Sequence, residues 1–183
     1  MRLQEKASRI RLIVLDVDGV LTDGQISIGL QGELCKHFNV KDGLGIKMLM
    51  EAGITVTIIT GRRSSIVAAR MRELGVGDVI QGCSDKRQAF MELIRARQIQ
   101  PEECACMGDD IPDLPVLTAV GLSAAPADAS DEVLRRVDYV ANRAGGAGAV
   151  REFAEFILKA QGQWEKLLAR RGVPPFNRGE GGA

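Results

Sequence analysis

Six short apolar runs, rich in β-branched residues, alternate with amphipathic segments, and this alternation constrains the fold more than any other feature. The runs are RLIVLDV (11–17), TVTIIT (55–60), DVIQG (78–82), CACMGDD (104–110), VGLSAA (120–125) and DYVAN (138–142). The segments between them carry apolar residues at three- and four-residue spacing, at 42–53, 64–75, 86–98, 113–120 and 129–137. Strands alternating with helices predict a doubly wound α/β domain with a mainly parallel sheet.

Three further segments lie outside this alternation. The stretch 24–38 has short alternating runs around Gly29 to Gly32, which predicts a β-hairpin that projects from the sheet. After a glycine-rich turn, 149–170 has the pattern of one long amphipathic helix, and 171–183 has the composition of a mobile tail. We therefore expect one domain over residues 1–170, followed by a tail.

Charge and hydropathy exclude several classes of partner. Lys plus Arg and Asp plus Glu number 24 each, so there is no electrostatic reason to expect nucleic acid or a membrane surface as a partner. The first ten residues are charged and lack the apolar stretch of a signal peptide, and no run is long enough to span a bilayer. These features predict a cytoplasmic protein that acts on small molecules or associates with copies of itself.

The thiols and the imidazole favour no catalytic role. The four cysteines fit no paired zinc spacing, and packing as buried, reduced thiols is the favoured interpretation for Cys35, Cys83, Cys104 and Cys106. Cys104 and Cys106 alternate along a predicted strand and should face the same side of the sheet. His37 is the only histidine, and a lone imidazole is more often a surface or core-edge residue than a catalyst, so no histidine-based triad is expected.

Polar side chains suited to phosphate or metal follow four of the predicted strands. Parallel sheets of this class bind ligands at the carboxyl ends of their strands. The residues at these ends are Asp16, Asp18, Thr60, Arg62, Lys86, Asp109, Asp110 and Asp113. Asp and Thr are favoured helix caps, so each could be explained singly as a cap, but the ordered set points to one site.

Other doubly wound proteins fit this order less well. In a phosphorelay receiver domain an acid pair precedes a phosphoacceptor aspartate on a later strand and the lysine comes last, whereas Lys86 here precedes GDDIPD (108–113). A dinucleotide-binding domain needs a glycine-rich turn after its first strand, and DVDGVL (16–21) is not one. A domain that has lost activity and only binds a ligand is disfavoured, because polar residues are retained at all four strand ends, and a phosphate-release assay decides it.

The segments DVDGVLT (16–22), ITGR (59–62), SDK (84–86) and GDDIPD (108–113) resemble the four motifs of the haloacid-dehalogenase superfamily, in their usual order. The resemblance implies that Asp16 is a nucleophile that forms an aspartyl-phosphate and that Asp18 is the general acid and base. It also implies that Thr60 hydrogen-bonds the transferring phosphoryl group and that Lys86 neutralises it.

The same resemblance implies a Mg²⁺ cofactor. The metal is expected to be held by the carboxylates of Asp16 and Asp109 and by the backbone carbonyl of Asp18, which relieves the repulsion between neighbouring carboxylates. Asp110 and Asp113 could orient the metal shell or cap a helix, and the sequence leaves both open.

The spacing of the motifs leaves no room for a cap domain, which predicts a capless member of the superfamily. HFNVKDGLGIK (37–47), TGRRS (60–64), GCSDK (82–86) and the segment 144–162 together resemble phosphatases of keto-sugar acid phosphates. The resemblance implies an eight-carbon substrate used in lipopolysaccharide precursor synthesis, with nine-carbon, sialic-type 9-phosphates as the alternative. The residues expected to bind this substrate, besides Asp18 and Lys86, are Asn39, Val40, Lys41, Asp42, Gly43, Lys47, Arg62 and Arg70.

An open site of this kind needs something else to exclude water during phosphoryl transfer. The hairpin is too small to be stable alone and carries alternating apolar residues, which suggests pairing with other copies of the chain. Relatives with these motifs are tetramers, so the resemblance implies a homotetramer in which an adjacent chain completes the pocket. The final helix and tail would then be free to act as a lid.

Overall fold

A six-stranded sheet forms the centre of the protein, as described by a computed structural model that covers residues 2–174. Its strand order is β5-β4-β1-β6-β7-β8, and every pairing is parallel. The strands are β1 (Leu12–Leu15), β4 (Thr55–Thr60), β5 (Asp78–Gln81), β6 (Cys104–Met107), β7 (Leu122–Ala125) and β8 (Tyr139–Val140). All six predicted strands are present, and the predicted parallel sheet is confirmed.

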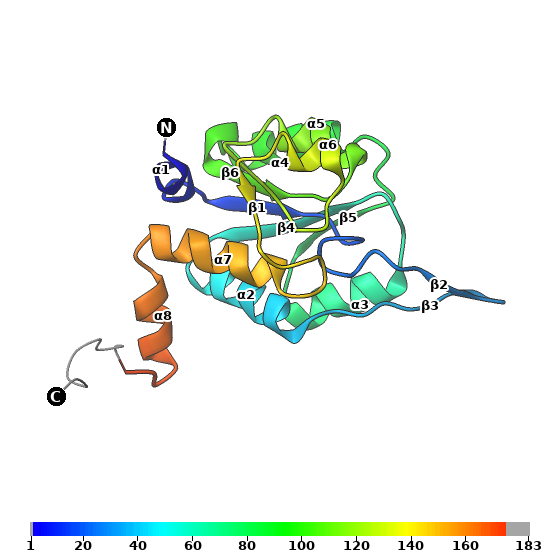
Figure 1. Ribbon diagram of the computed structural model, residues 1–183, viewed down its shortest axis with the longest axis horizontal. Helices are drawn as coiled ribbons and strands as arrows, with labels where there is room; N and C mark the ends of the chain where they lie inside the picture. Colours follow the sequence, from blue (N-terminus) through cyan, green and yellow to red (C-terminus); the bar gives the residue numbers. More distant parts are fainter. Residues whose placement is uncertain (1, 175–183) are drawn as a thin grey trace.

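Helices cover both faces of the sheet, as Figure 1 shows. One face packs against α1 (Leu3–Ala7), α2 (Val40–Glu51), α3 (Ser65–Leu74), α7 (Ala149–Ala160) and α8 (Trp164–Arg170). The other face packs against α4 (Lys86–Arg97), α5 (Leu114–Leu117) and α6 (Asp131–Leu134). Two short 3₁₀ turns, Pro101–Glu103 and Ile111–Asp113, precede β6 and α5. The fold is therefore the doubly wound α/β architecture that the alternation predicts.

Burial on both faces explains why the strand sequences are continuously apolar. In β1, Leu12 and Val14 join one core cluster while Ile13 and Leu15 join the other. Cys104 and Cys106 both point to the face covered by α4, and both are buried free thiols, as expected from their spacing. Cys35 is exposed on the hairpin, so the interpretation of that thiol as buried is wrong.

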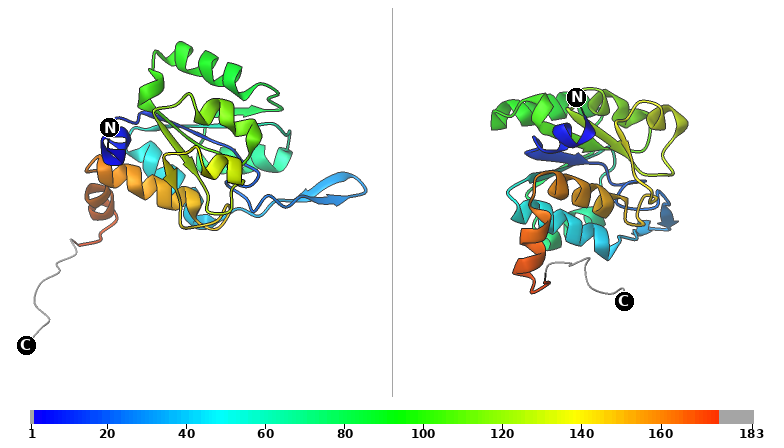
Figure 2. Two further views of the ribbon diagram at one scale, coloured as in Figure 1. Left: turned by 45° about the horizontal axis from the view of Figure 1, so that its top comes forward. Right: turned by 60° about the vertical axis from the view of Figure 1, so that its left-hand side comes forward.

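The hairpin consists of β2 (Ser27–Gly29) and β3 (Gly32–Cys35), which pair antiparallel as a separate two-stranded sheet. It extends away from the rest of the protein in Figure 1 and in the left view of Figure 2. Because it packs on no core cluster, its apolar side chains Ile28, Leu30 and Leu34 are exposed. The predicted projecting hairpin is confirmed.

The prediction of one long helix over 149–170 is wrong, because two helices occupy this segment. Gly162 has φ +63° and ends the run after α7. The side chain of Gln161 donates to the carbonyls of Ala7 and Ile10, which fixes the turn against the start of the chain. α8 then folds back and buries Leu167. Most of the predicted tail lies outside the described residues.

The connections between strands are short. Between β1 and β4 lie only the hairpin and α2, and between β4 and α4 lie only α3 and β5. Over residues 2–174 there is thus no cap domain, as the spacing predicts. No helix in this described part is both long and apolar enough to cross a bilayer.

Candidate active site

The loop after β1 positions Asp16 and Asp18 at the carboxyl edge of the sheet. The amide of Asp16 continues the strand pairing by donating to the carbonyl of Met107, 3.1 Å away. The chain then turns sharply, because the amides of Leu21 and Thr22 both donate to the carbonyl of Val17. This turn leaves Asp16 buried and Asp18 half-buried on the same side of the protein.

Lys86 joins two carboxylates at the start of α4. Its Nζ lies 3.0 Å from Asp16 Oδ1 and 2.7 Å from Asp113 Oδ1, and all three side chains are nearly buried. Burial lowers the pKa of Lys86, but the two carboxylates more than compensate and raise it above its usual value. Lys86 is therefore held as an ammonium beside Asp16.

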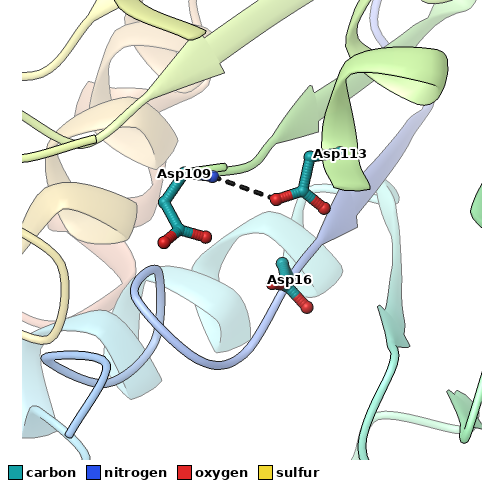
Figure 3. A group of neighbouring side chains, drawn as sticks. All are labelled: Asp16, Asp109 and Asp113. Carbon is teal, nitrogen blue, oxygen red and sulfur yellow. Dashed lines mark hydrogen bonds between the residues drawn. The ribbon is translucent and has the colours of Figure 1, made fainter. Parts of the chain in front are cut away.

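Asp113 organises the loop after β6. Its Oδ2 accepts hydrogen bonds from the amides of Asp109 and Asp110, at 3.1 and 3.4 Å. Figure 3 shows the first of these bonds and the three carboxylates of Asp16, Asp109 and Asp113, which face a common space. One oxygen of each lies within 4.8 Å of the others. Thus strand ends far apart in sequence bring three acids together.

The cost of this crowding is visible in the pKa values. Burial, and then the negative charge of Asp113, raise the pKa of Asp16 to about 6 even though Lys86 opposes the change. Burial raises the pKa of Asp109 to about 7, with Asp113 and Asp16 adding to the effect. A cation placed between the two carboxylates would offset their repulsion and lower both pKa values.

The residues present fit a hard divalent cation. Among the described residues, Asp16 Oδ1 is buried and faces only the ammonium of Lys86, 3.0 Å away, with no further donor. Gly19 has no side chain, and a Cβ there would lie 2.0 Å from Asp109 Oδ2, so only glycine leaves room for that carboxylate. Oxygen ligands of this kind suit Mg²⁺. Asp113 is already engaged by Lys86 and two amides, which favours an orienting role for it.

A cavity of about 300 Å³ opens over these groups. Thr60, the last residue of β4, is buried at its edge, and Arg62 lies beyond it with Nε 3.8 Å from Asp18 Oδ2. The lining residues are Asp16, Asp18, Gly24, Thr60, Gly61, Arg62, Lys86, Asp109, Asp110, Pro112 and Asp113. The structure thus brings together in one cavity all the strand-end residues that the sequence predicts for the site.

Lys36 is a site residue that the sequence did not reveal. It follows β3 directly, and its ammonium contacts the carboxylate of Asp18 and lies 3.0 Å from Glu33 Oε1. Its side chain is 1% exposed. No spacing or motif marks it, because a lysine in LCKHF (34–38) looks like any other solvated charge at a loop.

The other residues expected to bind substrate lie outside this cavity within one chain. Asn39 caps α2 by accepting from the amide of Lys41, and Asp42 accepts from the amides of Gly148 and Arg151. Lys41 lines a separate cavity of about 430 Å³, which is larger but contains none of the motif residues. Val40, Gly43, Lys47 and Arg70 line a third, of about 240 Å³. Their role in binding stays a prediction.

The glycine-rich turn before α7 supports the first motif. A Cβ on Gly145 would lie 1.8 Å from the carbonyl oxygen of Gly19, and one on Gly146 would lie 2.6 Å from the carbonyl carbon of Thr22. The amide of Gly146 donates to the carbonyl of Val20 at 3.0 Å. The two backbones can approach this closely only because both residues are glycine.

Comparison with known proteins identifies the family. A model of haloacid dehalogenase-like hydrolases matches residues 73–153. A 3-deoxy-D-manno-octulosonate 8-phosphate phosphatase of Yersinia pestis is 48% identical over 161 residues, which cover 88% of this chain and 86% of that protein.

Solved structures agree with the sequence match. The phosphatase of the same name from Moraxella catarrhalis, in complex with magnesium, phosphate and KDO, has a TM-score of 0.90 at 40% identity, covering 92% of this chain and 97% of its own. A cobalt-bound form from Haemophilus influenzae has a TM-score of 0.84 at 44% identity, covering 86% and 92%. From this identity, over most of both chains and on the same fold, the chain belongs to the family of 3-deoxy-D-manno-octulosonate 8-phosphate phosphatases, within the haloacid dehalogenase-like hydrolases.

Proposed function

We propose that this protein is a Mg²⁺-dependent phosphatase that hydrolyses 3-deoxy-D-manno-octulosonate 8-phosphate to the free sugar acid and phosphate. Such a step would supply a sugar for lipopolysaccharide precursors. The observation that carries the proposal is the placement of Asp16, beside Lys86 and Asp109 in one cavity, in a chain of this family. A buried carboxylate beside an ammonium group is the arrangement that nucleophilic phosphoryl transfer needs.

In the first step, a carboxylate oxygen of Asp16 attacks phosphorus opposite the sugar oxygen. The new bond joins Asp16 to phosphorus, and the bond between phosphorus and the sugar oxygen breaks. Asp18 gives its proton to that oxygen, so the sugar acid leaves as a neutral alcohol.

In the second step, Asp18 takes a proton from water. The water oxygen bonds to phosphorus, the bond from phosphorus to Asp16 breaks, and phosphate leaves. Splitting the displacement in two lets one residue serve as acid and then as base, and it returns both carboxylates to their starting state.

Charge on the transferring group is the main barrier that the remaining residues lower. Lys86 places an ammonium 3.0 Å from Asp16, where the phosphoryl oxygens would lie, and Thr60 offers a hydroxyl to the same cavity. Bound Mg²⁺ supplies further positive charge against the same oxygens. We assign its ligands to the carboxylates of Asp16 and Asp109 and to the carbonyl of Asp18, and we assign Asp113 to orienting Lys86 and the loop.

We also propose that the working form is a homotetramer in which an adjacent chain completes each pocket. Two features support this proposal: the hairpin exposes Ile28, Leu30 and Leu34, and several expected substrate ligands lie outside the cavity within one chain. Light scattering at assay concentration tests it, and a fully active monomer would refute it. The cytoplasmic location stays a prediction.

Phosphate release from a panel of sugar-acid phosphates, with Mg²⁺ present, tests the substrate. We expect the eight-carbon 8-phosphate to give the highest kcat/KM, and a higher value for a nine-carbon 9-phosphate would replace the proposed substrate. Asp16→Asn should retain at most about 1% of turnover, because an amide is a poor nucleophile. Asp131→Asn, at an exposed acid in the first turn of α6 and outside the cavity, is the control.

A further inference from the structure

The ammonium of Lys36 is buried between the carboxylates of Asp18 and Glu33. Its side chain is 1% exposed, whereas those of Asp18 and Glu33 are 19% and 16% exposed. A lysine is buried this deeply only when its charge is paired, so the two acids hold it in place. The Lys36 ammonium is therefore held in one position, in contact with both Asp18 and Glu33.

Anchoring of the hairpin does not account for this contact. Glu33 already ties the hairpin to α3, because the Ser64 hydroxyl donates to Glu33 Oε2 while Ser64 Oγ caps α3 by accepting from the amide of Val67. Lys36 adds a second connection, and it ends on a residue that lines the cavity. The contact thus acts on Asp18 rather than on the hairpin alone.

The two oxygens of Asp18 are distinguished by this contact. Oδ1 accepts from the Lys36 ammonium, so this oxygen is already engaged by a donor. Oδ2 faces Arg62 Nε at 3.8 Å, on the side where Arg62 lines the cavity. Oδ2 is therefore the oxygen of Asp18 that Lys36 does not hold.

We propose that Lys36 is a positioning residue that holds Asp18 by Oδ1 and thereby directs Oδ2 to the leaving oxygen and then to water. This inference rests on the proposed function, because it takes Asp18 to be the acid and base. Lys36 itself touches no reacting atom. Without it, the Asp18 side chain would be free to rotate toward Arg62, and proton transfer would lose its geometry.

Leaving-group dependence separates this role from a structural one. A sugar alkoxide leaves poorly and needs a proton, whereas p-nitrophenolate leaves without one. The ratio kcat/KM covers only the steps through formation of the aspartyl-phosphate, so the later base step drops out of it. Loss of a positioned acid should thus harm the alkyl phosphate far more than p-nitrophenyl phosphate.

The experiment compares Lys36→Met, Asp18→Asn and the double variant in the full chain with saturating Mg²⁺. For Lys36→Met we expect kcat/KM to fall about 100-fold with 3-deoxy-D-manno-octulosonate 8-phosphate, whose leaving group is an alkoxide. With p-nitrophenyl phosphate we expect a fall of about 5-fold or less. The double variant should be no worse than Asp18→Asn alone, since both changes remove one function. Lys6→Met is the control, because Lys6 pairs with Asp138 at the opposite edge of the sheet.

Equal losses on both substrates, or losses that multiply in the double variant, would overturn the proposal. If Lys36→Met does not fold, Lys36→Gln keeps one N–H donor and should show the same unequal loss to a smaller degree; an equal loss there overturns the proposal as well. Failure of the proposed function would give a different result. If Asp18 were not the acid, Asp18→Asn would itself lower kcat/KM equally for the sugar phosphate and for p-nitrophenyl phosphate.

Discussion

At the scale of single residues, one glycine decides whether the acidic cluster can exist. Gly19 has φ +87°, and its missing Cβ leaves the space that Asp109 Oδ2 occupies. An alanine would be strained by the backbone and would collide with the carboxylate 2.0 Å away. The turn after β1 and the metal site after β6 therefore depend on the same atom being absent.

We predict that Gly19→Ala weakens Mg²⁺ binding by about 10-fold or more, since Asp109 must move to admit the new methyl group. Isothermal titration calorimetry measures the affinity directly. Gly53→Ala is a matched control, because Gly53 has φ +86° but its added Cβ would meet nothing within 4 Å. That control should lose stability without losing metal. Unchanged Mg²⁺ affinity in Gly19→Ala would show that Asp109 is not a ligand.

At the scale of elements, the close packing of α2 on α7 depends on a glycine in α2 that has no side chain. A Cβ on Gly45 would lie 3.1 Å from Arg151 Cα in α7. Asp42, which precedes this glycine in α2, accepts from the amides of Gly148 and Arg151 at 3.2 and 2.7 Å. These amides begin α7, so Asp42 supplies a cap from another helix.

We predict that Asp42→Ala lowers the free energy of unfolding by about 1–3 kcal/mol, because it leaves buried amides at the start of α7 without an acceptor. Chemical denaturation measures the change. Asp131→Ala, an exposed acid in the first turn of α6, should cost less than about 0.5 kcal/mol. If Asp42→Ala were as stable as the natural protein but bound substrate less well, Asp42 would have the substrate role that the resemblance implies.

At the scale of the whole molecule, the acidic site makes stability depend on both pH and metal. The folded chain raises the pKa of Asp16 to about 6 and that of Asp109 to about 7, through burial first and neighbouring carboxylates second. The unfolded chain releases these protons near pH 4. The folded state therefore binds more protons above pH 4, and the stabilisation from these groups is lost as pH rises through 6 and 7.

We predict that Mg²⁺ raises Tm more at pH 8 than at pH 5.5, since at the lower pH it must displace protons from its own ligands. At about 100 times its Kd, a ligand that binds only the folded state adds about 2.7 kcal/mol, or a Tm shift of about 5–10 °C for a chain of this size. Thermal unfolding with EDTA, and with excess Mg²⁺, measures both shifts.

Asp109→Asn should lose most of this Mg²⁺ shift, whereas Asp110→Asn, the exposed neighbour, should keep it. An equal shift at both pH values would contradict the raised pKa values of the metal-free site.

Much of this architecture could be predicted from the sequence because it rests on local patterns. Each strand of the sheet is a run such as LIVL or TVTIIT, and the right-handed crossings of parallel strands leave their carboxyl ends at one edge. Asp16, Thr60, Lys86 and Asp109 follow those strands, so their meeting in one cavity follows from strand order alone.

The pairing of charges was decided only by the tertiary structure. Lys36 reaches Asp18 across 18 residues and Lys86 reaches Asp113 across 27, and the carboxylate of Asp42 accepts from the backbone amide of Arg151 across 109. The sequence near Lys36 and Asp42 has no period or motif that distinguishes these contacts from solvated charges. Such contacts depend on which loops the folded core brings together, and on the burial that makes a partner necessary.

The break between α7 and α8 at Gly162 was also decided by long-range contacts. Residues 149–170 have a helical pattern throughout, which by itself predicts one helix. The chain turns because the side-chain amide of Gln161 donates to the carbonyls of Ala7 and Ile10. The turn also allows α8 to bury Leu167 in the core. Local periodicity therefore determined the elements and the edge at which the site forms, whereas long-range burial and charge pairing decided how those elements end and which groups hold the catalytic carboxylates.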